Sequence, residues 1–120
     1  MRTHTISQDG WKTFFDSVSR IYDGSSGSLE ILSPDLGAQY EIENQPLRGI
    51  SYDKTGIELH FTARDGKHLT HRIANPKRVQ VEEGDDGLVE AVAFESDGDP
   101  RAVLRFQSPI ASHLLPRGEA

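Results

Sequence analysis

Turn signals recur about every ten residues from residue 28 onward, and they limit what this chain can fold into. Between the turns, apolar residues alternate with polar ones, which is the period of a β-strand with one buried face. Short strands separated by regular turns are typical of an antiparallel meander. The turns are Pro34 to Gly37, Asp53 to Gly56, Asp65-Gly66, Asn75-Pro76, Gly84 to Gly87 and Asp97-Gly98. The predicted strands are residues 28–33, 38–44, 47–52, 57–63, 68–73, 77–83, 88–95 and 101–107.

Only the stretch from Ser7 to Gly24 has the period of an α-helix. Its apolar side chains fall within an arc of about 120° on a helical wheel, and polar side chains fill the rest. Ser7 can cap the first free amides, Asp9 suits the positive end of the helix dipole, and Gly24 suits a left-handed residue that ends a helix. We expect the apolar row to pack on a sheet rather than to line a ligand pocket. The row consists of Trp11, Phe14, Phe15, Val18, Ile21 and Tyr22.

These patterns predict an α+β fold, in which one N-terminal helix packs on a curved, mainly antiparallel meander sheet of six to eight strands, open or rolled towards a barrel. At 120 residues the chain has the size of one domain. Residues 88–95 are apolar on both faces, so we expect the helix or the sheet's own curl to cover the second face. The domain is expected to span residues 1–107. Residues 108–120 form the expected C-terminal tail, with Ile110, Leu114 and Leu115 as docking residues.

The composition excludes several kinds of partner. Nineteen Asp and Glu residues against 13 Lys and Arg give a net charge of −6, and the positive residues are scattered, so we expect no nucleic-acid partner. No apolar run approaches the roughly 18 to 20 residues of a membrane span, and the first residues lack the apolar stretch of a signal peptide. The chain has no cysteine, which fits a reducing compartment. We therefore expect a cytoplasmic protein without a membrane partner.

The hairpin around Asp65-Gly66 holds three histidines, and its register decides whether they can meet. A two-residue loop would place His60 opposite His71 and would mix apolar and polar side chains on each face. A three-residue loop with Gly66 in the left-handed conformation gives one apolar face and an ion pair, and we predict this register. Its pairs are Ile57 with Ile73, Glu58 with Arg72, Leu59 with His71, His60 with Thr70, Phe61 with Leu69, and Thr62 with His68.

In this register His71 points inward, whereas His60 and His68 lie on the opposite face. The three histidines cannot share one metal ion, and we expect no metal site; a site made of His60, His68 and a carboxylate is the alternative that stays open. We interpret His71 as a core histidine that is hydrogen-bonded to the backbone, with a catalytic base as the alternative. We therefore assign no catalytic residue. The outer face is the candidate binding surface, formed by Glu58, His60, His68 and Arg72 beside Thr62 and Thr70.

Asp53 opens the turn "DKTG", where an aspartate can be a ligand, an acid or a turn residue. We favour the turn, in which the carboxylate accepts backbone amides and Gly56 takes the positive φ. The acidic stretch "EEGDDG" lacks the alternating ligands and the distal Glu of a calcium loop, so we expect a solvated turn. The sequence has no nucleophile elbow, no P-loop and no dinucleotide fingerprint, and we expect no cofactor.

Five segments together resemble a family of small bacterial proteins known only as a domain of unknown function. They are "WKTFFDSVSR", "LEIL", "GAQYEIENQPLRGISYD", "HRIANPKRVQVEE" and "DGDPRAVLRF". The resemblance extends from about Ser7 to Phe106 and implies a bacterial source and one compact domain. It implies no established activity that transfers to these residues. The features that carry it are Trp11, Phe14, Phe15, Gln39, Leu47, Gly49 to Asp53, His71, Ile73 and Pro76.

Two functional hypotheses remain. The first is a non-catalytic binding or assembly module of the bacterial cytosol, which meets a protein or a small molecule through the outer sheet face or a strand edge. The alternative is a small enzyme that uses His71, Asp53 or another carboxylate as general base, in a cavity between helix and sheet. A closed core around His71 would contradict the enzyme, and an open cavity that reaches His71 and a second titratable group would contradict the non-catalytic hypothesis. We also expect a homodimer, formed through a strand edge or the C-terminal tail.

Overall fold

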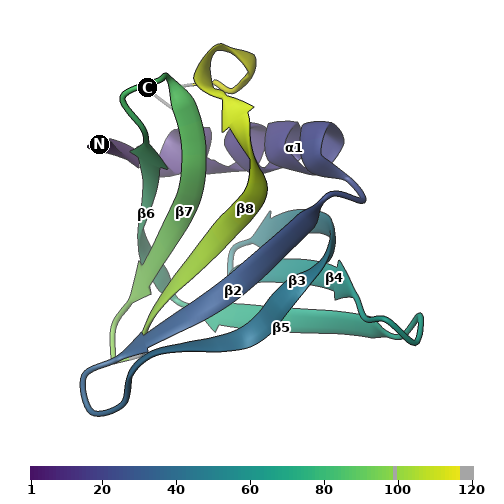
Figure 1. Ribbon diagram of the computed structural model, residues 1–120. Helices are drawn as coiled ribbons and strands as arrows, with labels where there is room; N and C mark the ends of the chain where they lie inside the picture. Colours follow the sequence, from purple (N-terminus) through teal and green to yellow (C-terminus); the bar gives the residue numbers. More distant parts are fainter. Residues whose placement is uncertain (99, 117–120) are drawn as a thin grey trace.

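One α-helix and one antiparallel sheet make up the part of the chain that this computed structural model describes, residues 1–98 and 100–116. Figure 1 shows the helix lying across one side of the sheet. The fold class predicted from the sequence is therefore confirmed. The elements are β1 (Arg2–Ile6), the 3-10 turn η1 (Gln8–Gly10), α1 (Trp11–Tyr22), β2 (Ser26–Ser33), β3 (Gly37–Asp53), β4 (Gly56–Thr62), β5 (His68–Ala74), β6 (Pro76–Glu83), β7 (Leu88–Ser96), β8 (Arg101–Ala111) and the 3-10 turn η2 (Ser112–Leu114).

The sheet consists of two antiparallel meanders joined by a long-range pairing. Its strand order is β1-β6-β7-β8-β2-β3-β4-β5, so β2 pairs with β8 and the chain passes from β5 to β6 without pairing them. In Figure 1 the strands β6, β7 and β8 run steeply across the page, whereas β4 and β5 lie nearly at right angles to them, which shows how strongly the sheet curls. Within the described residues β1 and β5 form the two edges, and the sheet does not close into a barrel.

Two strands differ from the prediction. Residues 38–44 and 47–52 form one long strand, β3, which is irregular at Asn44, where φ is 49°. Asparagine tolerates this left-handed conformation, and the Ser28 hydroxyl accepts a hydrogen bond from the Asn44 amide at 2.8 Å. The strand β1 was missed because only Ile6 of its five residues is buried, so the alternating apolar pattern is absent. Backbone pairing with β6, and not an apolar face, holds β1 in place.

The helix starts later than the sequence indicates. The 3-10 turn η1 occupies Gln8–Gly10, and α1 begins at Trp11 with Gly10 as its N-cap. Ser7 takes the N-cap position of η1 and makes no side-chain capping hydrogen bond, so its predicted role at the start of α1 is wrong. The end of α1 is as predicted, since Gly24 follows it with a φ of 85°.

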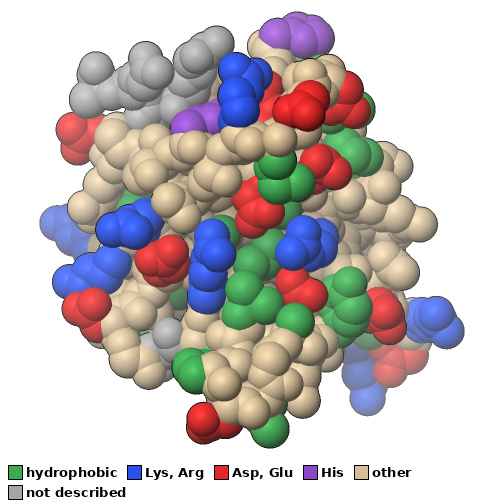
Figure 2. All heavy atoms as spheres, turned by 60° about the vertical axis from the view of Figure 1, so that its left-hand side comes forward, with side chains coloured by type: hydrophobic (Ala, Val, Ile, Leu, Met, Phe, Trp, Pro, Cys, Tyr) green, Lys and Arg blue, Asp and Glu red, His purple; other side chains and the backbone are tan. Residues whose placement is uncertain are grey.

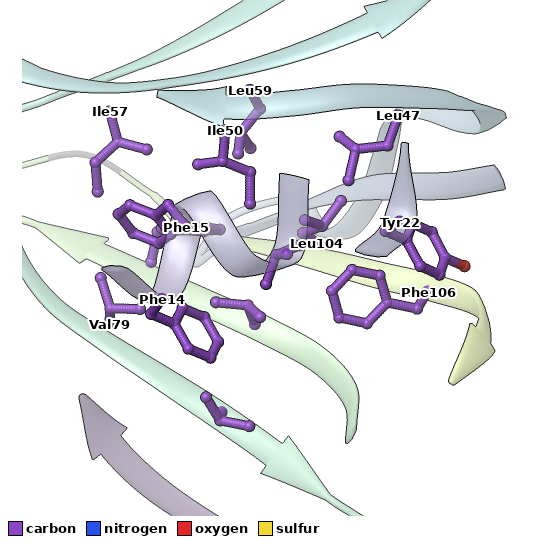
Figure 3. Packing of buried hydrophobic residues seen from close by; sticks show 14 of the residues in the cluster. Phe14, Phe15, Tyr22, Leu47, Ile50, Ile57, Leu59, Val79, Leu104 and Phe106 are labelled. Carbon is purple, nitrogen blue, oxygen red and sulfur yellow. The ribbon is translucent and has the colours of Figure 1, made fainter. Parts of the chain in front are cut away.

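The apolar row of α1 forms the centre of the core. Phe14, Phe15 and Val18 are each at most 1% exposed, and the prediction that this row packs on the sheet is confirmed. Figure 3 shows Phe14 and Phe15 beside core residues from several strands of the sheet. The centroids of the Tyr22 and Phe106 rings lie 4.7 Å apart, and the Trp11 indole donates a hydrogen bond of 3.0 Å to the carbonyl of Ile6. The row therefore links α1 to β1 and to β8.

The outer face of the β7–β8 region holds a second, smaller apolar cluster. Ala91 and Ala93 are fully buried, and Val103 is 1% exposed. Leu32 of β2 packs against this cluster, and Arg105 beside it lies opposite Ala91 and is ion-paired to Glu30 at 3.0 Å. Figure 2, in which β6 and β7 come forward, shows apolar side chains enclosed by charged ones.

The stretch after Gln107 continues the domain up to Pro116. Residues 108–111 belong to β8, where Ile110 pairs with Val89 and is 4% exposed. Leu115 is 8% exposed and joins the same core, whereas Leu114 is 51% exposed. Two of the three residues expected to dock a tail are thus core residues of their own chain. Residues 117–120 of the expected tail lie outside the described part.

We predict that Phe15→Ala lowers the free energy of unfolding by about 3–5 kcal/mol, because the phenyl ring is buried between α1 and the sheet. Denaturant titration measures this loss. Lys12→Ala on the exposed face of the same helix is the matched control and should change stability by about 0.5 kcal/mol or less. A loss below about 1 kcal/mol for Phe15→Ala would contradict the anchoring role.

Candidate functional site

The hairpin of β4 and β5 has the predicted register. Ile57 lies opposite Ile73, Leu59 opposite His71, and Thr62 opposite His68. The loop between the strands has three residues, since the Ala63 amide donates to the Lys67 carbonyl at 2.8 Å, and Gly66 has a φ of 86°. The hairpin therefore separates His71 from the other two histidines.

The turn at Asp53 is confirmed in one respect and wrong in another. One carboxylate oxygen of Asp53 accepts hydrogen bonds from the Thr55 amide and hydroxyl, both at 2.7 Å, and from the Gly56 amide at 3.1 Å. Gly56, however, has no positive φ; it is buried, and a Cβ atom there would lie 2.6 Å from the Ile73 carbonyl oxygen. The glycine is thus needed for the close approach of β4 and β5 and not for the turn conformation.

The candidate surface residues on the outer face of the hairpin form one connected group. Arg72 is ion-paired to Glu58 at 3.3 Å and also bonds the Thr55 hydroxyl. The Nδ1 atom of His60 lies 3.2 Å from Nε2 of His68. Sequence reasoning therefore placed these four residues, Glu58, His60, His68 and Arg72, on one surface as the structure has them.

His71 is not the core histidine that the sequence indicates. Its side chain is 23% exposed, and its Nδ1 atom lies 2.8 Å from Oε2 of Glu41, a carboxylate on β3. The partner is therefore a side chain and not a backbone group. Glu41 was missed because β3 and β5 are not neighbours in the sheet, so no strand register pairs the two residues.

An open cavity of about 340 Å³ adjoins the His71–Glu41 pair. It lies where β5 approaches β7, and its described lining belongs to the strands and to the turn before β8. It is not the cavity between helix and sheet that the alternative enzyme hypothesis describes, since none of its described lining residues comes from α1. The lining residues are Ile31, Glu41, His71, Arg72, Ile73, Phe94, Ser96, Pro100 and Ala102.

A wider hollow of about 820 Å³ lies between β1, β6 and η2. It contains Glu83, which is 6% exposed and ion-paired to Arg2 at 3.3 Å. One of its walls ends at Pro116, the last described residue, so only part of its boundary is defined. The cavity beside His71 is the better-defined candidate site.

No group of three or more His, Asp or Glu side chains in the described part of the chain is arranged to hold a metal ion. Asp53 in particular is occupied by its turn, and His71 lies on the face opposite His60 and His68. In the same residues, no helix has the length and apolar character needed to cross a membrane.

The described residues form a small α+β domain with an open pocket beside His71 and Glu41. By sequence, the chain belongs to a family of unknown function, DUF5335, whose profile matches residues 2–114. It is 30% identical over 110 residues to an uncharacterized protein of Aquifex aeolicus (strain VF5). The aligned region covers 92% of this chain and 96% of that protein. No solved structure matches the chain significantly. The resemblance to a family of unknown function is thus confirmed.

We predict that Asp53→Ala lowers stability at neutral pH and flattens the loss of stability in acid. The hydrogen bonds from the Thr55 hydroxyl and then the Thr55 amide lower the pKa of Asp53 below its ordinary value of 3.8. The carboxylate therefore stabilises the fold above the unfolded pKa, and this contribution is lost as the pH falls through the folded pKa.

Urea titrations of both proteins from about pH 7 to pH 2 measure this difference. Asp35→Ala, in the exposed turn between β2 and β3, is the matched control and should keep the pH profile of the parent. If Asp53→Ala also kept that profile, the turn hydrogen bonds would contribute nothing to stability.

Proposed function

We propose that this domain binds a small molecule in the cavity beside His71 and Glu41. The main support for this proposal is an open cavity of about 340 Å³ that combines an apolar wall with an oriented histidine. Pockets for small ligands begin at about 300 Å³ and have mostly apolar linings with a few fixed polar groups. The wall is supplied by Ile31, Phe94 and Ala102.

The polar groups suggest what the ligand looks like. The Nδ1–H group of His71 donates to Glu41, which fixes the ring and leaves Nε2 for a ligand. Glu41 adds a negative charge to the lining, whereas the guanidinium of Arg72 is bound to Glu58 on the opposite face. The ligand is therefore a compact molecule with an apolar body and a hydrogen-bonding group that reaches His71. The reducing compartment suggested by the absence of cysteine supports a role in the bacterial cytosol.

A small enzyme is the second candidate, and the His71–Glu41 pair favours it. A carboxylate that holds one ring nitrogen of a histidine is the arrangement of a general base and its orienting group. We expected an open cavity that reaches His71 and a second titratable group to contradict the non-catalytic hypothesis, and the cavity reaches His71 and Glu41. It does not separate the two candidates, because a receptor can use the same fixed histidine to bind a ligand without transforming it.

A thermal-shift screen of small metabolites tests the pocket. We predict that at least one ligand raises the melting temperature of the parent protein and that His71→Ala and Ala102→Met abolish the shift. The first substitution removes the polar contact, and the second extends a flexible apolar side chain into the cavity. Thr70→Ala, on the outer face of the same strand, is the matched control.

A ligand whose shift survives both pocket substitutions would contradict this site. Following each ligand by NMR during incubation separates the two candidates: a compound that is consumed by the parent and not by His71→Ala identifies an enzyme, and a compound that is bound unchanged identifies a receptor.

We also propose that the chain forms a homodimer through a strand edge. The edges β1 and β5 carry backbone groups that neighbouring strands do not pair on one side. The alternative interface, the tail, has lost support because Ile110 and Leu115 are buried within their own chain.

We predict a dimer in sedimentation experiments at micromolar concentration. Leu114→Ser, which removes the exposed apolar residue of η2, should leave the dimer intact. A monomeric parent protein would refute the dimer. If the parent is a dimer and Leu114→Ser is a monomer, the interface lies at η2 and not at a strand edge.

A further inference from the structure

Two histidines meet on the outer face of the hairpin, on the side opposite the proposed ligand pocket. His60 on β4 and His68 on β5 are diagonal neighbours, because His60 lies opposite Thr70 and His68 lies opposite Thr62. Their ring centroids are 5.4 Å apart, and the Nδ1 atom of His60 lies 3.2 Å from Nε2 of His68. The two paired strands thus hold two imidazole nitrogens next to each other at the surface.

This nitrogen separation fits two ligands of one zinc ion. Zinc binds histidine nitrogens at about 2.0–2.1 Å in tetrahedral geometry, and two such bonds across 3.2 Å subtend about 103° at the metal. An angle of 90°, as in square-planar or octahedral sites, would require nitrogens only about 2.9 Å apart. The observed separation is closer to the roughly 3.3 Å of an ideal tetrahedral angle, so it fits a tetrahedral ion.

The other ring nitrogen of His60, Nε2, has a hydrogen-bond partner of the kind that zinc-bound histidines commonly have. This Nε2 atom lies 3.0 Å from the Ser51 hydroxyl and 3.8 Å from a carboxylate oxygen of Glu58. An Nε2–H group that donates to the Ser51 hydroxyl leaves the lone pair of Nδ1 on the side of His68, where the Thr70 hydroxyl also lies 3.4 Å from Nδ1. Ligating histidines commonly have such an outer partner, which fixes the ring and increases its basicity. Arg72 in turn holds Glu58 at 3.3 Å.

Little movement is needed to admit an ion. In a hydrogen-bonded pair of rings, the lone pair of one nitrogen points along the line between the two nitrogens. A zinc ion at about 2.05 Å from both lies about 40° off that line, which small rotations of surface side chains can reach. The His68 side chain is exposed, so no core residue opposes its rotation.

We infer that His60 and His68 form a two-histidine zinc site on the outer face of the hairpin, with Ser51 and Glu58 as the partners that orient His60. Within the described residues no third histidine or carboxylate completes the site, so water or a group from a second molecule supplies the remaining ligands. This proposal departs from the expectation of no metal site and develops the alternative of a two-histidine site with a carboxylate, which here lies beside His60 and not on the zinc. A site of all three histidines stays excluded, because His71 lies on the other face.

Calorimetric titration of the full, tag-free chain with Zn²⁺ tests the site. The parent protein should bind zinc saturably, either one ion per chain or one ion shared by two chains. His60→Ala and His68→Ala should each abolish this binding, and Ser51→Ala should weaken it by about tenfold or more, as loss of an outer partner does.

His71→Ala is the matched control, since it removes a histidine from the same strand but from the opposite face. It should bind zinc as the parent does. Circular dichroism of the metal-free proteins shows that each variant is folded. No saturable binding by the parent, or equal binding by His60→Ala and His68→Ala, would overturn the inference and leave only a hydrogen-bonded histidine pair.

Discussion

The position of every candidate functional group depends on the register between β4 and β5. A shift of one residue would turn each side chain of β5 to the other face of the sheet. The three-residue loop, closed by Gly66 with its φ of 86°, sets this register, and the apolar pairs Ile57–Ile73 and Phe61–Leu69 fix it on the inner side. One backbone conformation thus sends His71 inward and places His60 beside His68 outside.

The second determinant is the curl of the sheet around α1. Phe15 lies against Tyr52 of β3 and Phe94 of β7, with ring centroids 6.3 Å and 6.0 Å apart, so a single side chain bridges the two meanders. The curl brings β5 towards β7 without pairing them, and the space left between them is the cavity beside His71. The pocket is therefore a consequence of a sheet that bends far but stays open.

Features set by neighbouring residues could be predicted from the sequence, and features set by long-range packing could not. The helix row around Phe15 and the hairpin register follow from local periodicity and turn chemistry. The Glu41–His71 pair does not, because Glu41 on β3 and His71 on β5 belong to strands that are not neighbours in the sheet. Gly56 was expected to adopt a positive φ in the turn, but it is needed where two strands approach closely. A glycine in the sequence looks the same in both cases, so the sequence could not separate these two roles.

The central claim is that Glu41 fixes the ring of His71 so that Nε2 serves the cavity. NMR of the imidazole nitrogens in the full chain tests this claim directly, because it shows which ring nitrogen carries the proton. The account predicts a proton on Nδ1 of His71 in both the neutral and the charged ring, and loss of this preference in the neutral ring when Glu41 is replaced by Ala. A neutral His71 protonated on Nε2 alone would contradict the account, because Nδ1 could then not donate to Glu41.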